Sequence, residues 1–207
     1  FIVEHPKTAR AFLKQVDTAT PLQQLTLMEL SEHTKPDELE TLIAPLLASK
    51  DVGLISEAGC PAVADPGANL VHLAHRKGIR VVPLVGPSSI MLALMASGLN
   101  GQRFAFHGYL PVDKAERKKK LQELEVAARS RDETQIFIET PYRNRALMEA
   151  IVESCNGETE LCVASEITTA AERIETRPLA QWKKALPEID KQPAVFLLYT
   201  AGKVKKR

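Results

Sequence analysis

The fold is decided by the stretch Ser56-Glu57-Ala58-Gly59-Cys60-Pro61-Ala62-Val63-Ala64-Asp65-Pro66-Gly67. An apolar run at 52–55 precedes it and a helical pattern at 69–75 follows it. The stretch is therefore expected at the carboxyl end of a strand, where open α/β sheets bind their ligands. Its two prolines restrict the backbone, and its two glycines allow a ligand to approach closely. The alternative is an ordinary turn between a strand and a helix.

Outward from this loop, short apolar runs alternate with helical patterns, which predicts parallel βαβ units. We expect an α/β fold of two domains, 1–85 and 86–207, and a frayed basic tail at 203–207. Strands are expected at 1–3, 25–30, 52–55, 79–84, 104–106, 135–138, 161–164 and 194–199. Helices are expected at 5–16, 34–47, 69–77, 88–97, 114–129, 143–155 and 178–186.

Composition limits the class of protein. The 207 residues carry a net charge of +1, so no overall basic field indicates nucleic acid. The three cysteines, at 60, 155 and 162, are widely spaced, which favours free thiols in the cytoplasm over disulfides or a zinc site. No apolar run reaches the ~18 residues of a membrane helix. His72 and His75 share a helix face but lack a third ligand, so we expect a solvated surface and no metal.

Four blocks, in this order, resemble one protein family. They are Glu57–Gly67, Val81–Leu99, Phe104–Pro111 and Ile136–Arg143. The chain resembles the tetrapyrrole methylases, which use S-adenosyl-L-methionine (SAM), and most of all the branch containing the bacterial 16S rRNA 2′-O-ribose (cytidine) methyltransferases. The resemblance implies a homodimeric methyltransferase of two α/β domains, with the SAM cleft between them.

The resemblance also implies the residues that bind SAM, though it assigns no catalytic base. They are Gly59, Cys60, Pro61, Val63, Ser88, Ser89, Glu139, Thr140, Ile167 and Ala194. Such a set suffices because methyl transfer mainly requires alignment of donor and acceptor and exclusion of water. As alternatives, Ser88 is a helix N-cap and Ala194 only begins a strand.

RNA is the expected methyl acceptor because a basic cluster follows the third block. It comprises Lys114, Arg117, Lys118, Lys119 and Lys120. A solvated helix face is the alternative, since Glu116, Glu123 and Glu125 interleave. The chain departs from the rRNA branch at Cys60, usually Thr, and at Pro141-Tyr142-Arg143, usually a His-Arg pair. A small metabolite or tetrapyrrole-like acceptor, or a non-catalytic SAM-binding protein, remains an alternative.

The chain opens on Phe1-Ile2-Val3-Glu4, which is typical of the middle of a domain rather than a start. The family pattern extends ahead of this point with a strand and a Pro/Gly-rich loop that contacts SAM. We therefore expect the first domain to lack its first strand in this sequence.

Overall fold

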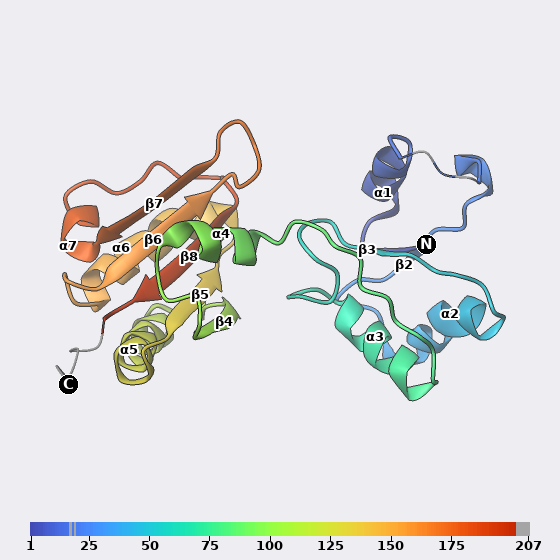
Figure 1. Cartoon of the computed structure of the whole chain (residues 1–207), viewed down its shortest axis with the longest axis horizontal. Coiled ribbons are helices and arrows are strands. Elements are labelled where there is room, and N and C mark those ends of the chain that lie inside the picture. Colours follow the sequence, from blue (N-terminus) through green and yellow to red (C-terminus); the bar gives the residue numbers. More distant parts are fainter. Residues whose placement is uncertain (17, 19, 202–207) are drawn as a thin grey trace. The chain divides into compact units, whose positions relative to one another are not determined.

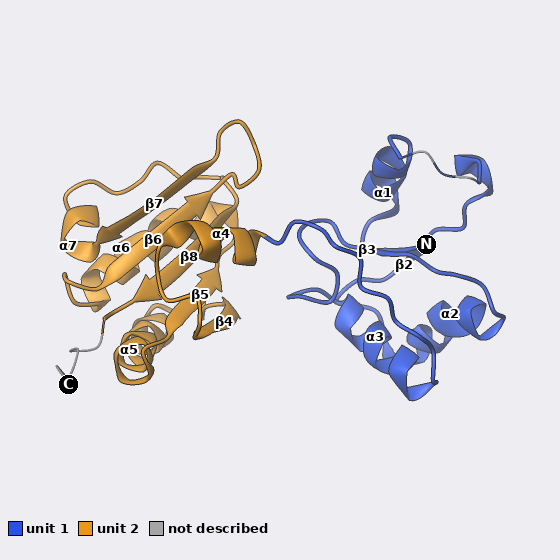
Figure 2. Ribbon diagram, viewed as in Figure 1, with its two compact units in different colours: residues 1–88 blue, residues 89–207 orange. Residues whose placement is uncertain are grey.

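The fold consists of two compact units, residues 1–88 and 89–207 (Figures 1 and 2). A computed structural model describes residues 1–16, 18 and 20–201. The basic tail expected at 203–207 lies outside the described residues. Because each unit has buried apolar clusters of its own, each is described separately.

Unit 1 contains a small parallel sheet with strand order β2-β1-β3. Its hydrophobic core includes Ile2 and Ile43, which are both fully buried. The sheet places the residues after β2 and after β3 at the same edge, because carboxyl ends of parallel strands coincide. The elements are β1 (Ile2–Val3), α1 (Pro6–Leu13), η1 (Leu22–Gln24), β2 (Met28–Glu29), α2 (Pro36–Leu47), β3 (Leu54–Ile55) and α3 (Gly67–Arg76).

The strand expected at 79–84 is not formed. The segment has no regular secondary structure and joins no sheet in the described part of unit 1. Val82 is 56% exposed, Leu84 88% and Val85 fully exposed. The prediction of a strand here was wrong, because a strand requires a hydrogen-bonding neighbour as well as apolar composition, and composition does not reveal that neighbour.

Unit 2 contains a five-stranded sheet with order β4-β5-β8-β6-β7. Only β4 and β5 are parallel; the other three pairs are antiparallel. The expectation of parallel units was therefore wrong for most of this sheet. The segment 166–172 joins β6 to β7 without a helix, and a short connection permits only antiparallel pairing. The strands are β4 (Phe104–Tyr109), β5 (Thr134–Ile138), β6 (Glu160–Ser165), β7 (Arg173–Pro178) and β8 (Ala194–Tyr199).

Helices cover both faces of this sheet. Residues alternate along β5 and β8, so Phe137 and Phe196 face one side, with ring centroids 5.9 Å apart, while Ile136 and Val195 face the other. α5 (Lys114–Arg131), α6 (Asn144–Ser154) and α7 (Leu179–Trp182) pack on the first side, and α4 (Ser89–Ser97) on the second.

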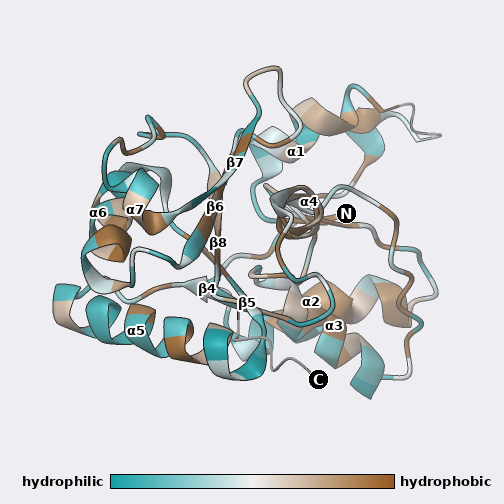
Figure 3. Ribbon diagram, turned by 60° about the vertical axis from the view of Figure 1, so that its left-hand side comes forward, coloured by the Kyte–Doolittle hydropathy of each residue, from teal (hydrophilic) through white to brown (hydrophobic). Residues whose placement is uncertain are grey.

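The ends of unit 2's helices differ from the sequence-based expectations. The helix expected at 178–186 ends at Trp182, and β7, too polar to be identified in the sequence, was missed. α5 is hydrophilic along most of its length (Figure 3) and places only four of its residues in the core. A short 3-10 turn, η2 (Pro141–Arg143), links β5 to α6.

Candidate functional site

The loop after β3 has an unusual backbone held by one carboxylate. Gly59, Ala62 and Ala64 have φ angles of 70°, 67° and 54°, in the left-handed region. Asp65 Oδ1 accepts hydrogen bonds from the backbone nitrogens of Ala62 at 2.9 Å and Gly67 at 2.8 Å. A charged acceptor shared by two donors fixes the loop where the strand ends.

The expected cofactor residues of unit 1 gather on this loop and on the segment 86–88. Cys60 Sγ lies 3.7 Å from the carbonyl oxygen of Pro87, which brings the loop beside that segment. A Cβ atom built on Gly59 would meet nothing within 4 Å, so open space borders its backbone. Val63 is 48% exposed, and Pro61 and Ser88 are half-buried. The first two blocks of the resemblance therefore meet in unit 1.

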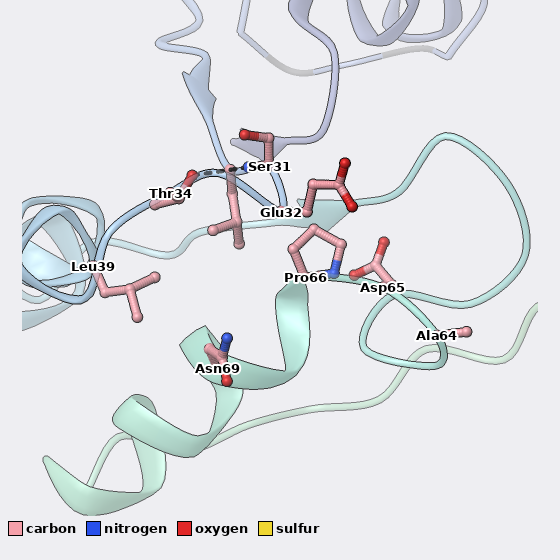
Figure 4. Close-up of a pocket in the computed structure, with 9 residues that line it drawn as sticks. Ser31, Glu32, Thr34, Leu39, Ala64, Asp65, Pro66 and Asn69 are labelled. Carbon is pink, nitrogen blue, oxygen red and sulfur yellow. Dashed lines mark hydrogen bonds between the residues drawn. The ribbon is translucent and has the colours of Figure 1, made fainter. Parts of the chain in front are cut away.

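A pocket of about 330 Å³ borders the same loop (Figure 4). Its lining residues come from the segment after β2, from α2, from the loop after β3 and from α3: Leu30, Ser31, Glu32, Thr34, Leu39, Ala64, Asp65, Pro66 and Asn69. Thr34 Oγ1 accepts a hydrogen bond from the backbone nitrogen of Ser31 at 2.9 Å. Ser31 and Glu32 were not predicted as site residues, although their position shortly after a parallel strand is the same signal that identified the Ser56–Gly67 loop.

The expected residues of unit 2 lie at one end of its sheet. Ile138 pairs with Val195, and Ser165 pairs with Ala194. Glu139 and Thr140 follow β5, Ala194 begins β8, and Ile167 comes two residues after β6. The backbone nitrogen of Glu166 donates to the Pro193 carbonyl oxygen at 3.1 Å. Because β5 and β6 both pair antiparallel with β8, the residues after β5, the residues after β6 and the start of β8 lie at the same end of the sheet, although they are far apart in the sequence.

Ser89 reaches the same region through α4, which it begins. Its neighbour Ile90 packs in one apolar cluster with Ile138 and Ile167. α4 thus packs on the face of the sheet that carries this cluster, against β6, β7 and β8. The resemblance assigns Ser89 to the site, and its neighbour Ile90 packs on the same side of the sheet as Ile138 and Ile167.

The Glu139 carboxylate is buried and forms an ion pair with Arg143. The Glu139 side chain is fully buried, and Oε1 accepts from Arg143 Nη2 at 2.6 Å and Nε at 2.9 Å. The backbone nitrogen of Thr140 donates to the same oxygen at 2.7 Å. Oε2 is buried and has no hydrogen-bond partner among the described residues. Glu139 thus fixes the chain after β5, which sequence alone did not indicate.

The basic cluster at the start of α5 is smaller than expected. Arg117 is only 6% exposed, and its Nη1 donates to the Val112 carbonyl oxygen at 3.3 Å. It faces the core because residues 117, 121, 124 and 128 share one side of the helix. Lys118 and Lys119 are exposed and Lys120 is half-buried. An RNA contact by Arg117 is therefore excluded.

The cysteines are all free. Burial, together with the nearby Glu125, raises the pKa of Cys155 to about 12, and burial raises the pKa of Cys162. Within residues 1–16, 18 and 20–201, no three His, Cys, Asp or Glu side chains lie together as metal ligands would. None of the described helices combines the length and apolar character that a membrane crossing needs.

Comparison with known proteins decides the family. Residues 4–183 match the family model described as Tetrapyrrole (Corrin/Porphyrin) Methylases. The chain belongs to this family. The resemblance seen in the four sequence blocks is thereby confirmed, and so is the α/β fold class.

Several curated relatives carry one name, Ribosomal RNA small subunit methyltransferase I. The protein from Vibrio cholerae is 39% identical over 152 residues, which are 73% of this chain and 51% of that protein. The protein from Mesorhizobium japonicum is 40% identical over 148 residues, 72% of this chain and 49% of that protein. The chain thus spans about half the length of these relatives.

Solved structures of the family share the fold at low identity. The methyltransferase CobJ matches with a TM-score of 0.62 at 18% identity, over 96% of this chain and 82% of that chain. Cobalt precorrin-4 methyltransferase CbiF matches with a TM-score of 0.58 at 16% identity, over 96% of this chain and 82% of that chain. Uroporphyrin-III C-methyl transferase from Thermus thermophilus, complexed with S-adenyl homocysteine, gives 0.50 at 18%, over 86% of this chain and 78% of that chain.

Proposed function

We propose that this chain is part of a SAM-dependent methyltransferase that methylates ribosomal RNA on a ribose 2′-oxygen. The observation that carries the proposal is the 39–40% identity to proteins named Ribosomal RNA small subunit methyltransferase I. The similar corrin and porphyrin enzymes lie at 16–18% identity, which supports the fold but not their substrates. We also propose a homodimer in the cytoplasm, as the resemblance implies.

The residues present fit SAM. The open space beside Gly59 leaves room for a ligand against the backbone, and Asp65 holds that backbone in place. We assign binding to the loop residues and to the collected strand ends: Gly59, Cys60, Pro61, Val63, Ser88, Ser89, Glu139, Thr140, Ile167 and Ala194. The role of Glu139 is to orient Thr140, whose backbone nitrogen it binds.

When bound, SAM supplies an electrophilic methyl group on its sulfonium. The chain's contribution is to hold donor and acceptor in line and to exclude water, which accounts for large rate effects without an acid–base triad. The hydroxyl and backbone groups of the two loops are sufficient donors and acceptors for a ligand of this size. No residue is assigned as the base that removes the ribose proton.

Calorimetry with SAM tests the cofactor assignment. Gly59→Val introduces a branched side chain at a φ of 70°, beside the proposed ligand. Gly78→Val is the matched control, since Gly78 has a φ of 71°, is equally open, and lies after α3. Both variants suffer the same backbone strain of about 1–2 kcal/mol. We expect Gly59→Val alone to lose SAM affinity at least about tenfold. Equal affinity in both variants would remove the loop from the site.

A methyl-transfer assay tests the acceptor. The chain is incubated with SAM labelled on its methyl group and with small ribosomal subunits isolated from cells that lack the modification, and in a parallel reaction with a tetrapyrrole. Ribose-linked label in the RNA supports the proposal. Label in a tetrapyrrole but not in RNA would replace it with the small-molecule alternative, and SAM binding without any transfer would indicate a non-catalytic binding protein.

A further inference from the structure

The η2 turn at Pro141–Arg143 is fixed on both sides. The backbone nitrogen of Arg143 donates to the Thr140 carbonyl oxygen at 2.9 Å, and that of Lys191 to the Pro141 carbonyl oxygen at 3.2 Å. Asn144 Nδ2, directly after the turn, donates to the carbonyl oxygens at 189 and 192, at 3.1 and 2.7 Å. The backbone of this turn is therefore tied to the segment that precedes β8.

This fixed turn presents an aromatic ring to solvent. Tyr142 is 82% exposed. A ring on an ordered backbone loses little conformational entropy when it binds a partner. Tyr109 is 57% exposed and ends β4, opposite Ile138 on the parallel strand β5. The carboxyl edge of this strand pair therefore offers two aromatic surfaces, the type of side chain on which unpaired bases stack.

Arg143 adds an oriented guanidinium next to Tyr142. Its Nε and Nη2 are held by the buried Glu139, and Nη1 has no partner within the described part of the chain. The side chain is 33% exposed. A guanidinium fixed in this way can contact a phosphate oxygen without losing further rotamer freedom. The exposed residues Lys191 and Asp190 lie beside the turn and carry opposite charges, so they create no strong positive potential there. The turn therefore offers a phosphate one oriented contact, from Arg143.

We propose that Tyr142 and Arg143 bind single-stranded RNA, with Tyr142 stacking on a base and Arg143 contacting one phosphate. The inference rests on the proposed function and identifies where unit 2 would hold that acceptor. The combination of an aromatic ring with an adjacent cation matches the base and the phosphate of one nucleotide. We favour RNA over a second protein because the exposed side chains of the segment bonded to the turn, Asp190 and Lys191, are charged.

Fluorescence anisotropy with a labelled, mixed-sequence single-stranded oligoribonucleotide tests the proposal on the full chain. Tyr142→Ala should weaken RNA binding about tenfold at every salt concentration, because stacking does not release counterions. Tyr142→Phe keeps the stacking surface and should stay within about twofold. Arg143→Gln should lower the slope of log affinity against log salt by about 0.7, the value for one phosphate on a single strand.

Two matched controls lie close by. Arg145→Gln removes an exposed arginine two residues further along the chain that pairs with Glu149, and Phe104→Ala removes an exposed ring at the opposite end of β4 from Tyr109. Both should leave RNA affinity within about twofold. SAM affinity, measured by calorimetry, should be unchanged in both Tyr142 variants and in the two controls; Arg143→Gln is left out of this comparison because Arg143 pairs with Glu139, which is assigned to SAM binding. Arg143→Gln leaves Glu139 buried without its ion-pair partner, so the thermal unfolding of the Arg143→Gln variant is measured as well. If the Arg143→Gln variant does not fold, Tyr142→Ala alone tests the proposal.

The outcomes separate this inference from the proposed function. RNA affinity that survives Tyr142→Ala but is lost on changing Lys118, Lys119 and Lys120 to Glu overturns the inference and leaves an RNA methyltransferase. An RNA affinity and a salt slope that are both unchanged in Arg143→Gln also overturn it. A parent chain that binds SAM but shows no salt-dependent RNA affinity contradicts both the RNA acceptor and this inference.

Discussion

The two units of this chain differ in how much of their structure is buried. Unit 2 has strands of five or six residues, and β5, β6 and β8 are almost wholly buried. Unit 1 has three strands of two residues each, and the exposed segment 79–85 carries several apolar side chains. Burial of apolar surface is the main favourable term in folding, so unit 2 should be the more stable unit.

The candidate ligand-binding parts differ in the same way. In unit 1, the loop at 56–66 is held mainly by the half-buried Asp65, and its left-handed residues lie near the surface. In unit 2, the turn after β5 is fixed by the fully buried Glu139 and by Asn144. The comparison indicates that unit 1 provides an adaptable loop and unit 2 a rigid edge, because local stability follows the burial of the groups that hold each segment.

The largest expected effect is in the core of unit 2. Phe196→Ala removes a fully buried ring that stacks on Phe137, and it should cost about 3–5 kcal/mol of unfolding free energy. Peptide-resolved hydrogen exchange in urea should show that the loss of unfolding free energy is confined to unit 2. Phe104→Ala, at a 40% exposed ring, is the control and should cost far less. Equal losses at 104 and 196 would break the comparison.

The next effect concerns the loop of unit 1. Asp65→Ala removes two hydrogen bonds from a charged acceptor and should cost about 1–3 kcal/mol, with faster exchange at 59–67 and weaker SAM binding. Asp51→Ala, at an exposed carboxylate before β3, is the control. If Asp65→Ala left exchange in the loop unchanged, another group would have to hold these backbone nitrogens.

A smaller effect is expected at the helix starts. Asp113 Oδ1 accepts from the backbone nitrogens of Ala115 and Glu116 at 2.9 Å, so Asp113→Ala should lower unfolding free energy by about 1 kcal/mol. His5 occupies the same position before α1 but makes no side-chain cap. His5→Ala should therefore change stability by less than about 0.5 kcal/mol in thermal unfolding. A greater loss at 5 than at 113 would contradict the difference in capping.

The smallest effect is a pH dependence in unit 2. Tyr199 donates to Asp132 Oδ1 at 2.6 Å, and this hydrogen bond raises the pKa of the phenol from its ordinary value of 10.0 to about 12. A raised pKa means that the native state favours the neutral phenol. Its stabilisation is complete below pH 10 and is lost as pH rises towards 12. Tyr199→Phe should abolish this part of the alkaline stability loss, measured as urea midpoints against pH.

Sequence alone determined most of the alternation of strands and helices in unit 1, the placement of the Ser56–Gly67 loop after a strand, and the family. Each follows from local information: apolar periodicity, turn residues and the order of four blocks. The loop stands out because glycine and proline act on their own backbone, whatever the rest of the chain does.

Tertiary structure alone decided which strands pair and what the pairing brings together. The sequence pattern of 79–84 is that of a strand, yet the segment has no sheet partner, and Arg117 belongs to a basic cluster yet lies in the core. The union of Glu139, Ile167 and Ala194 at one edge depends on antiparallel pairing with β8, the last strand in the chain. The partner of each strand and the direction of its pairing depend on contacts between residues far apart in the chain. The periodicity of a short sequence segment does not predict those contacts.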